Sequence, residues 1–223
     1  MASQDPALER WLQDASQRFP ARLEETHRYV LGLARVTREL AAPNFTDTPD
    51  SWKSVELFHI KLHSVLEDLY EPVKKRAEVS KAFVLTRSTG ARTIQQALID
   101  CVVERFDILS AMRDALSFEQ RAGIRLLRNY ASHTGIESDG LRFKGGKLKD
   151  SITVCGRTLS IEELDDLRNR LAENLSNELE GAKHVARIIR EYVDQLFATY
   201  EREMAIHERV TTLERSQREA SAR

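Results

Sequence analysis

Apolar residues recur every three or four positions along most of the chain, with charged side chains between them. This spacing predicts amphipathic helices, because residues three and four apart lie on one face of an α-helix. The first forty residues are expected to form two helical pieces, since Pro20 restarts the chain after Phe19. The segment 42–50 then holds two prolines, two aspartates and an asparagine, and it predicts a loop.

Three further helices are expected before residue 135. One begins near Ser51 and is ended or kinked by Pro72, and the next, the most apolar so far, follows a break at residues 88–90. Ser117 and Gln120 form a capping box, so another helix starts at about Phe118 and is expected to stop at Gly135. The apolar stripes of these helices are Val55, Phe58, Leu62, Val65, Leu66 and Leu69; Ile94, Ala97, Leu98, Cys101, Val102, Phe106, Leu109 and Met112; and Ala122, Leu126, Leu127 and Tyr130.

The last third of the chain begins with a different pattern. Short β-branched runs around two glycine turns predict a small β-hairpin insert at residues 140–158. Ser160 and Glu163 form a second capping box, which opens one very long helical region with an expected bend at Gly181. Beyond about Leu213 the apolar stripe ends and fraying is expected.

The prediction is therefore an all-α helical bundle with a small hairpin insert. Residues 1–50 form an N-terminal helical extension and loop, residues 51–200 the main helical domain, and residues 201–223 the charged end of the last helix and a tail. The 9 glycines and 5 prolines are too few for the many turns of an all-β fold. An apolar content of 41% with a net charge of −1 excludes a disordered chain, and that charge excludes a protein that coats nucleic acid broadly.

Cysteine content and the N-terminus restrict the location. Cys101 and Cys155 are too few for a disulfide framework or a thiolate zinc site. The N-terminus has no basic-then-apolar signal region, and no apolar run approaches the roughly 20 residues that span a bilayer. We therefore expect a cytoplasmic protein that does not bind membranes.

The spacing arginine, four residues, histidine occurs three times, at Arg22–His27, Arg128–His133 and Arg202–His207. Only the central pair has an amide after the arginine, small residues before the histidine and a glycine after it. Leu23 follows the first arginine and Glu203 the last, and an acid there would repel a phosphate. The central pair is the candidate site, and the other two pairs are interpreted as structural.

The segment Arg128-Asn129-Tyr130-Ala131-Ser132-His133 resembles the signature of the HEPN superfamily, whose ribonuclease members carry arginine, a polar residue and a histidine at this spacing. The resemblance covers residues 51–200 and implies a helical endoribonuclease that uses no metal or other cofactor and works as a homodimer. It also implies a toxin or antiviral-defence setting, in which an antitoxin or regulatory protein is a further partner. A tyrosine found two places after the histidine in members silenced by nucleotidylation is replaced here by Gly135.

These residue types suit RNA cleavage to 2′,3′-cyclic phosphate ends. Histidine has an ordinary pKa near 6.5, so His133 can accept the proton of the attacking 2′-hydroxyl. The planar fork of Arg128 matches phosphate oxygens, and Asn129 would orient a group or hold the nucleotide. On a straight helix Arg128 and His133 point about 140° apart, so either the helix unwinds or a partner chain completes the site.

Charged residues around the motif extend the candidate site. Glu104 and Asp107 on the preceding helix are candidates to orient Arg128. Few acids lie between Arg121 and Lys149, and the basic side chains there are predicted to bind the RNA backbone, although those of the insert also suit an exposed solubilising hairpin. The predicted RNA-binding residues are Arg125, Arg142, Lys144, Lys147 and Lys149.

Two other functions stay open at this point. Many HEPN domains are inactive and serve as dimerisation or partner-docking modules, a role that the mixed-charge C-terminal helix suits. A metal-binding bundle is the other, because Glu24 and His27, Glu56 and His59, and His59 and His63 each share a helical face.

Overall fold

The structure is a computed structural model that describes residues 6–45, 51–86, 93–132, 143–144, 147–148, 151–175 and 178–221. Most of these residues are helical, so the predicted all-α class with a small β-hairpin is confirmed. The helices are α1 (Pro6–Leu40), α2 (Ser51–His63), a π-helical turn (Ser64–Asp68), α3 (Tyr70–Thr86), α4 (Thr93–Asp114), α5 (Phe118–Ser132), α6 (Ile161–Leu175) and α7 (Glu178–Ser221). The strands are β1 (Phe143–Lys144), β2 (Lys147–Leu148), β3 (Ser151–Val154) and β4 (Arg157–Ser160).

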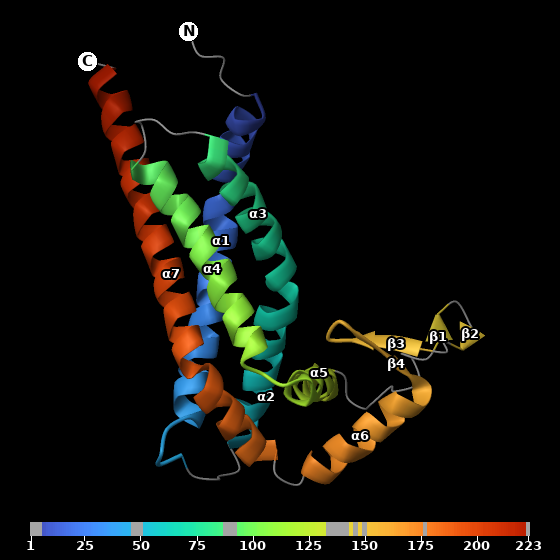
Figure 1. The fold of residues 1–223 in the computed structure, drawn as a ribbon. Coiled ribbons are helices and arrows are strands. Elements are labelled where there is room, and N and C mark those ends of the chain that lie inside the picture. The colour runs from blue at the N-terminus through green and yellow to red at the C-terminus, as the bar shows by residue number, and fades with distance from the viewer. Residues whose placement is uncertain are drawn as a thin grey trace.

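Helices α1, α2, α3, α4 and α7 lie lengthwise in one elongated bundle (Figure 1). Helix α7 packs against α1 and α4, α3 packs against α4, and α1 packs against α2. Helix α1 contributes to the same core as α2, so the packing continues across residue 50. Each large aliphatic side chain in this core stabilises the fold by about 1.5–3 kcal/mol. The largest side chains buried there include Leu33, Phe58, Leu62, Leu109, Met112, Ile189 and Leu196.

Two prolines lie within helical segments. Helix α1 runs unbroken from Pro6 to Leu40, so the prediction of two pieces that separate at Pro20 was wrong. A proline inside a helix costs one backbone hydrogen bond, whereas starting a second helix costs the entropy of a new first turn. The continuous helix α1 avoids that nucleation cost. Pro72 lies in the first turn of α3, where its missing N–H has no helical partner to lose.

The interruption expected near Pro72 lies just upstream of it. The N–H of Leu69 donates to the carbonyl of Ser64 at 3.0 Å, five residues back, which closes a π-helical turn. Val65 and Leu66 in this turn are buried in the core. The wider turn adds one residue to the helical spacing and keeps both side chains on the core side before α3 begins.

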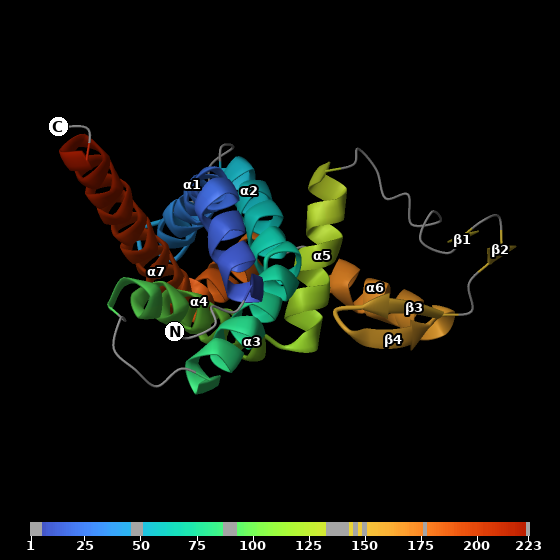
Figure 2. The same ribbon diagram turned by 90° about the horizontal axis from the view of Figure 1, so that it is seen from above.

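Helix α5 crosses the bundle instead of running along it. It appears end-on beside α2 in Figure 1 and lengthwise in Figure 2, and its main packing partner is α2. Ile124 on one side of α5 is buried in the bundle core, and Ala122 on another side is buried against the hairpin. Helix α5 therefore joins the bundle to the rest of the chain.

Strands β3 and β4 form the predicted hairpin, with Ser151 opposite Ser160 and Val154 opposite Arg157. Strands β1 and β2 form a second, two-residue pair. Cys155 and Gly156 connect β3 to β4 with φ values of +48° and +81°. Two consecutive positive φ values are those of a type I′ hairpin turn, which matches the twist of the strands. A small hairpin core lies between these strands, α5 and α6, and consists of Ala122, Val154, Cys155, Leu159, Leu164 and Leu167 with Phe118 against it.

The single long helical region expected after Ser160 is two helices, α6 and α7. Leu164 and Leu167 face the hairpin core, whereas Val185 and Ile189 face the bundle core. One straight helix cannot pack against two cores that lie in different directions, so α6 and α7 are separate helices. Gly181, where a bend was expected, lies within α7. Helix α7 also continues to Ser221, past the point where fraying was expected. None of the described helices is long and apolar enough to cross a membrane.

Candidate functional site

The helix that carries the candidate motif starts at a well-formed cap. The Ser117 hydroxyl accepts the Gln120 N–H at 3.2 Å, and the Gln120 side chain accepts the Ser117 N–H at 2.8 Å. This reciprocal pair is the predicted capping box, and it fixes where α5 begins. Because Ala122 and Ile124 are both buried, the helix is held on two sides and its arginine-bearing face lies between them.

The predicted catalytic residues lie at the far end of α5. Arg128 and Asn129 occupy the helix backbone within one turn of its last residue, Ser132. His133 comes directly after that end and lies outside the described residues, as do Arg142 and Lys149. Lys144 and Lys147 are placed as backbone partners across β1 and β2.

Arg125 is the predicted RNA-binding residue whose side chain the structure describes. Its Nη1 donates to the carbonyl oxygen of Thr153 on β3 at 3.5 Å, a long hydrogen bond between α5 and the hairpin. Arg121 lies one turn earlier on the same helix face, and its buried Nε has no hydrogen-bond acceptor among the described residues. The Arg125 side chain therefore connects α5 to the hairpin, and Arg121 acts electrostatically on Cys155 in the hairpin turn.

Two more arginines approach this junction and stack on aromatic rings. The Arg113 guanidinium at the end of α4 lies 4.0 Å above the Tyr70 ring, and its Nη2 is 4.0 Å from a carboxylate oxygen of Glu67. The Arg157 guanidinium on β4 lies 5.1 Å above the Phe118 ring. Stacking covers the face of a guanidinium and leaves its N–H edge available to an anion. We call the four side chains of this junction the arginine seam: Arg113, Arg121, Arg125 and Arg157.

The Cys155 thiol shows that three of these arginines share one neighbourhood. Burial raises the pKa of Cys155, and the Glu67 carboxylate raises it further. Arg125, Arg121 and Arg113 act on the same thiol in the opposite direction and lower its pKa. Three cations and one carboxylate thus act on the same buried thiol.

The histidine proposed for a metal site on α2 is a core residue. His59 is buried, its Nδ1–H donates to the Val55 carbonyl at 2.7 Å, and its ring meets the edge of Phe58. Burial lowers the pKa of His59 from 6.5 to about 4, so the ring is neutral at physiological pH. Glu56 is exposed on another side of the helix. Among the residues that the structure describes, no group of three His, Cys, Asp or Glu side chains is arranged to hold a metal ion.

The histidine of the first arginine–histidine pair packs between two helices. The His27 ring stacks on the Phe197 ring of α7, with ring centroids 5.1 Å apart and planes 19° from parallel. Glu24, one turn before it, is exposed. His27 therefore helps to pack α1 against α7.

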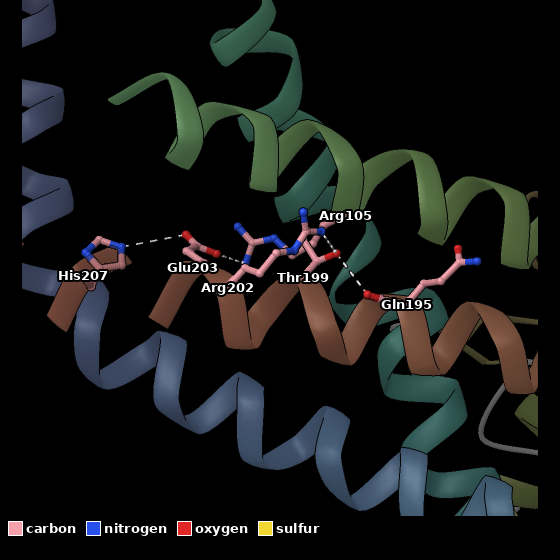
Figure 3. A network of polar contacts seen from close by, with 6 residues as sticks. All are labelled: Arg105, Gln195, Thr199, Arg202, Glu203 and His207. Atoms are coloured by element: carbon pink, nitrogen blue, oxygen red, sulfur yellow. Dashed lines mark hydrogen bonds and ion pairs between the residues drawn. The ribbon is translucent and has the colours of Figure 1, made fainter. Parts of the chain in front are cut away.

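The last pair, Arg202 and His207, belongs to a polar network between α4 and α7 (Figure 3). Arg202 Nη2 donates to Glu104 Oε2 at 2.6 Å and to Thr199 Oγ1 at 3.0 Å. His207 Nε2 lies 3.9 Å from a carboxylate oxygen of Glu203. Glu104, one of the two candidates to orient Arg128, forms an ion pair with Arg202, because α4 packs against α7 along this face.

The buried centre of this network was not found in the sequence. Arg105 Nη1 and Glu203 Oε2 are 2.6 Å apart, and the Arg105 guanidinium lies 4.5 Å above the Tyr200 ring. A signal was present, because Arg105 lies four residues from Cys101 and from Leu109, in the middle of an apolar stripe. A charge on the apolar side of a helix indicates a buried partner. The seam residues Arg113 and Arg157 were also missed, since each adjoins a helix end or a turn, where charges are common.

The comparisons with known proteins do not place the chain in a family. No protein-family model matches it, and no curated protein or solved structure is significantly similar to it.

Proposed function

We propose that this protein is a metal-independent endoribonuclease of the HEPN type, with a catalytic site formed by Arg128, Asn129 and His133. The observation that supports the proposal most is the position of the motif. Arg128 and Asn129 lie near the end of the helix that crosses the bundle, and Arg121 and Arg125 occupy the preceding turns of that helix. A cationic face that leads to the motif suits a polyanionic substrate.

In the proposed reaction, His133 accepts the proton of a ribose 2′-hydroxyl as that oxygen attacks the adjacent phosphorus. The 5′-oxygen of the following nucleotide leaves and takes up a proton from water, and the products are a 2′,3′-cyclic phosphate and a 5′-hydroxyl. Arg128 donates to the phosphoryl oxygens, where negative charge develops in the transition state. Asn129, four residues before His133, orients the imidazole or the nucleotide. The bond that forms and the bond that breaks are both P–O bonds, so no redox partner is needed.

The site is proposed to be shared between two copies of the chain. Arg128 and His133 diverge by about 140° on a straight helix, so one helix presents them poorly to a single phosphate. Two motif helices that meet at a two-fold axis would supply an arginine and a histidine to each phosphate. The proposed setting is a toxin or defence effector in which a regulatory protein controls access to this site.

The direct test is cleavage of end-labelled RNA by the purified full-length protein in the presence of EDTA. We expect fragments that carry 2′,3′-cyclic phosphate by mass spectrometry, and no cleavage at a 2′-deoxy substitution. Arg128→Ala and His133→Ala should each lower the cleavage rate by about a hundredfold or more. Arg190→Ala and His184→Ala are matched controls, because both side chains are exposed on α7 and should leave the rate unchanged.

A mixing experiment tests the shared site. If one chain supplies the arginine and the other the histidine, mixed dimers of Arg128→Ala and His133→Ala subunits recover part of the activity. Absence of recovery would contradict a site shared in this way. Cleavage that survives both substitutions would contradict the catalytic role of Arg128 and His133. Wild-type protein that forms dimers but cleaves no RNA would favour the inactive docking module over the enzyme.

A further inference from the structure

The arginine seam brings four guanidinium groups to the junction of α4, α5 and the hairpin. Among the described residues, the Glu67 carboxylate lies 4.0 Å from Arg113, and both side chains are partly exposed. An excess of cations held close together is costly unless an anion is bound there, because like charges repel one another.

Among the described residues, the contacts of the seam arginines engage few of their hydrogen-bond donors. Arg113 and Arg157 lie against aromatic faces, and such stacking orders a guanidinium without using its N–H groups. Arg125 makes one long hydrogen bond to the Thr153 carbonyl, although a guanidinium has five N–H donors. Arg121 Nε has no acceptor among the described residues. Ordered guanidinium groups with free edges are suited to phosphate, which accepts paired N–H donors.

The seam is continuous with the proposed catalytic end of α5. Phe118, Arg121 and Arg125 are three and four residues apart, so they share the face of α5 that meets the hairpin. Arg128 follows Arg121 by seven residues, or two helical turns, and its position in the helix continues the same row. From Arg121 to Arg128 the row extends about 10 Å along the helix axis, which suits consecutive phosphates of one strand.

We propose that the arginine seam binds the phosphodiester backbone of single-stranded RNA, with α5 on one side and hairpin β3–β4 on the other, and directs the strand to Arg128. This inference rests on the proposed ribonuclease function and assigns Arg113, Arg121 and Arg157 a role in substrate binding. Helix α5 and the hairpin meet through the hairpin core, so the seam has a preformed geometry. Recognition through backbone phosphates predicts little sequence preference in binding.

Fluorescence anisotropy with a labelled single-stranded RNA tests the seam on full-length His133→Ala protein, in which the RNA stays intact. Arg157→Ala and Arg121→Lys should each weaken binding by roughly fivefold at moderate salt. The lysine substitution keeps the positive charge at position 121 and removes the paired N–H donors of the guanidinium group. Arg157→Ala should also reduce the slope of log K against log[salt] by about 0.7, the value for one phosphate contact with a single strand. Arg190→Ala is the matched control, since Arg190 is exposed on α7.

The outcomes separate this inference from the proposed catalysis. The RNA-binding role of the seam would be overturned if Arg157→Ala has unchanged affinity and salt slope and a circular dichroism spectrum like that of the parent. This holds even if cleavage depends on Arg128. Equal loss of affinity in the Arg190→Ala control would also overturn it, because binding would then follow total charge. If the seam variants weaken RNA binding while the wild type never cleaves RNA, the seam stands and the catalytic proposal fails.

Discussion

Arg105 Nη1 and Glu203 Oε2 lie 2.6 Å apart inside the bundle, with only 3% and 1% of their side chains exposed. The pair links α4 to α7, and the guanidinium also covers the ring of Tyr200. Burying two charges costs several kcal/mol of hydration each, which their mutual attraction only partly offsets. The pair therefore fixes how α4 sits against α7 more than it adds to the net stability of the fold.

Loss of one partner should be far more damaging than loss of both. We expect Glu203→Leu to lower the free energy of unfolding by about 3–5 kcal/mol, because Arg105 is then left buried and unpaired. The double variant Arg105→Met/Glu203→Leu should recover most of that loss, since two apolar side chains need no hydration. Urea denaturation of the four proteins in this mutant cycle measures the effect. Equal losses in the single and double variants would contradict it.

The buried histidine on α2 makes stability depend on pH. Burial lowers the pKa of His59 to about 4, whereas the unfolded chain titrates near 6.5, so the unfolded state binds more protons between these values. The stabilising contribution of neutral His59 is complete above pH 6.5 and is lost as the pH falls from 6.5 toward 4. We expect a loss of about 3 kcal/mol from this residue over that interval. Denaturation of wild type and His59→Leu between pH 7.5 and pH 4 tests this. The free energy of unfolding of the wild type should fall more steeply with decreasing pH than that of His59→Leu. An equal pH dependence in the two proteins would show that His59 is not responsible.

Two glycines with open space around them should respond to alanine in opposite ways. No atom lies within 4 Å of a Cβ added at Gly181 or at Gly156. Gly181 is helical, so Gly181→Ala should stabilise the protein by roughly 0.5 kcal/mol through lower backbone entropy of the unfolded chain. Gly156 has a φ of +81°, so Gly156→Ala should destabilise the hairpin by about 1 kcal/mol. Thermal unfolding gives the sign for each variant, and two shifts of the same sign would contradict the turn geometry.

The third arginine–histidine pair should be dispensable for RNA cleavage. Arg202 and Glu104 form a surface ion pair with about half of each side chain exposed, and such pairs contribute at most about 1 kcal/mol. We expect Arg202→Ala and His207→Ala to keep the cleavage rate within about twofold of wild type, whereas Arg128→Ala should lower it by about a hundredfold or more. A loss of activity in Arg202→Ala without loss of folding would move the proposed site from α5 to α7.

Local features of the fold were predictable because they depend on neighbours in sequence. Both capping boxes form as expected: Ser160 and Glu163 exchange hydrogen bonds of 2.8 and 3.2 Å at the start of α6, as Ser117 and Gln120 do at α5. The Cys155-Gly156 turn of the hairpin was found for the same reason. The motif in α5 was also readable in the sequence, since it is a pattern within six residues.

Features that depend on distant contacts were not predictable in the same way. Apolar residues recur every three or four positions in both α6 and α7, yet Leu164 and Leu167 face the hairpin core whereas Val185, Ile189 and Leu196 face the bundle core. Periodicity states that a helix face is buried but not what covers it. For that reason the break between α6 and α7 was missed.

The sequence by itself determined that this protein is helical, where most of its helices begin, and that Arg128 and Asn129 lie on the helix that follows Ser117. These properties follow from hydrogen bonds and side-chain spacing within a few residues. Only the tertiary structure decided that Glu104 pairs with Arg202, that Arg105 meets Glu203 inside the bundle, and that the arginines of α4, α5 and β4 gather at one junction. The partner of a charged side chain is set by how helices pack, and no local spacing along the chain encodes that arrangement.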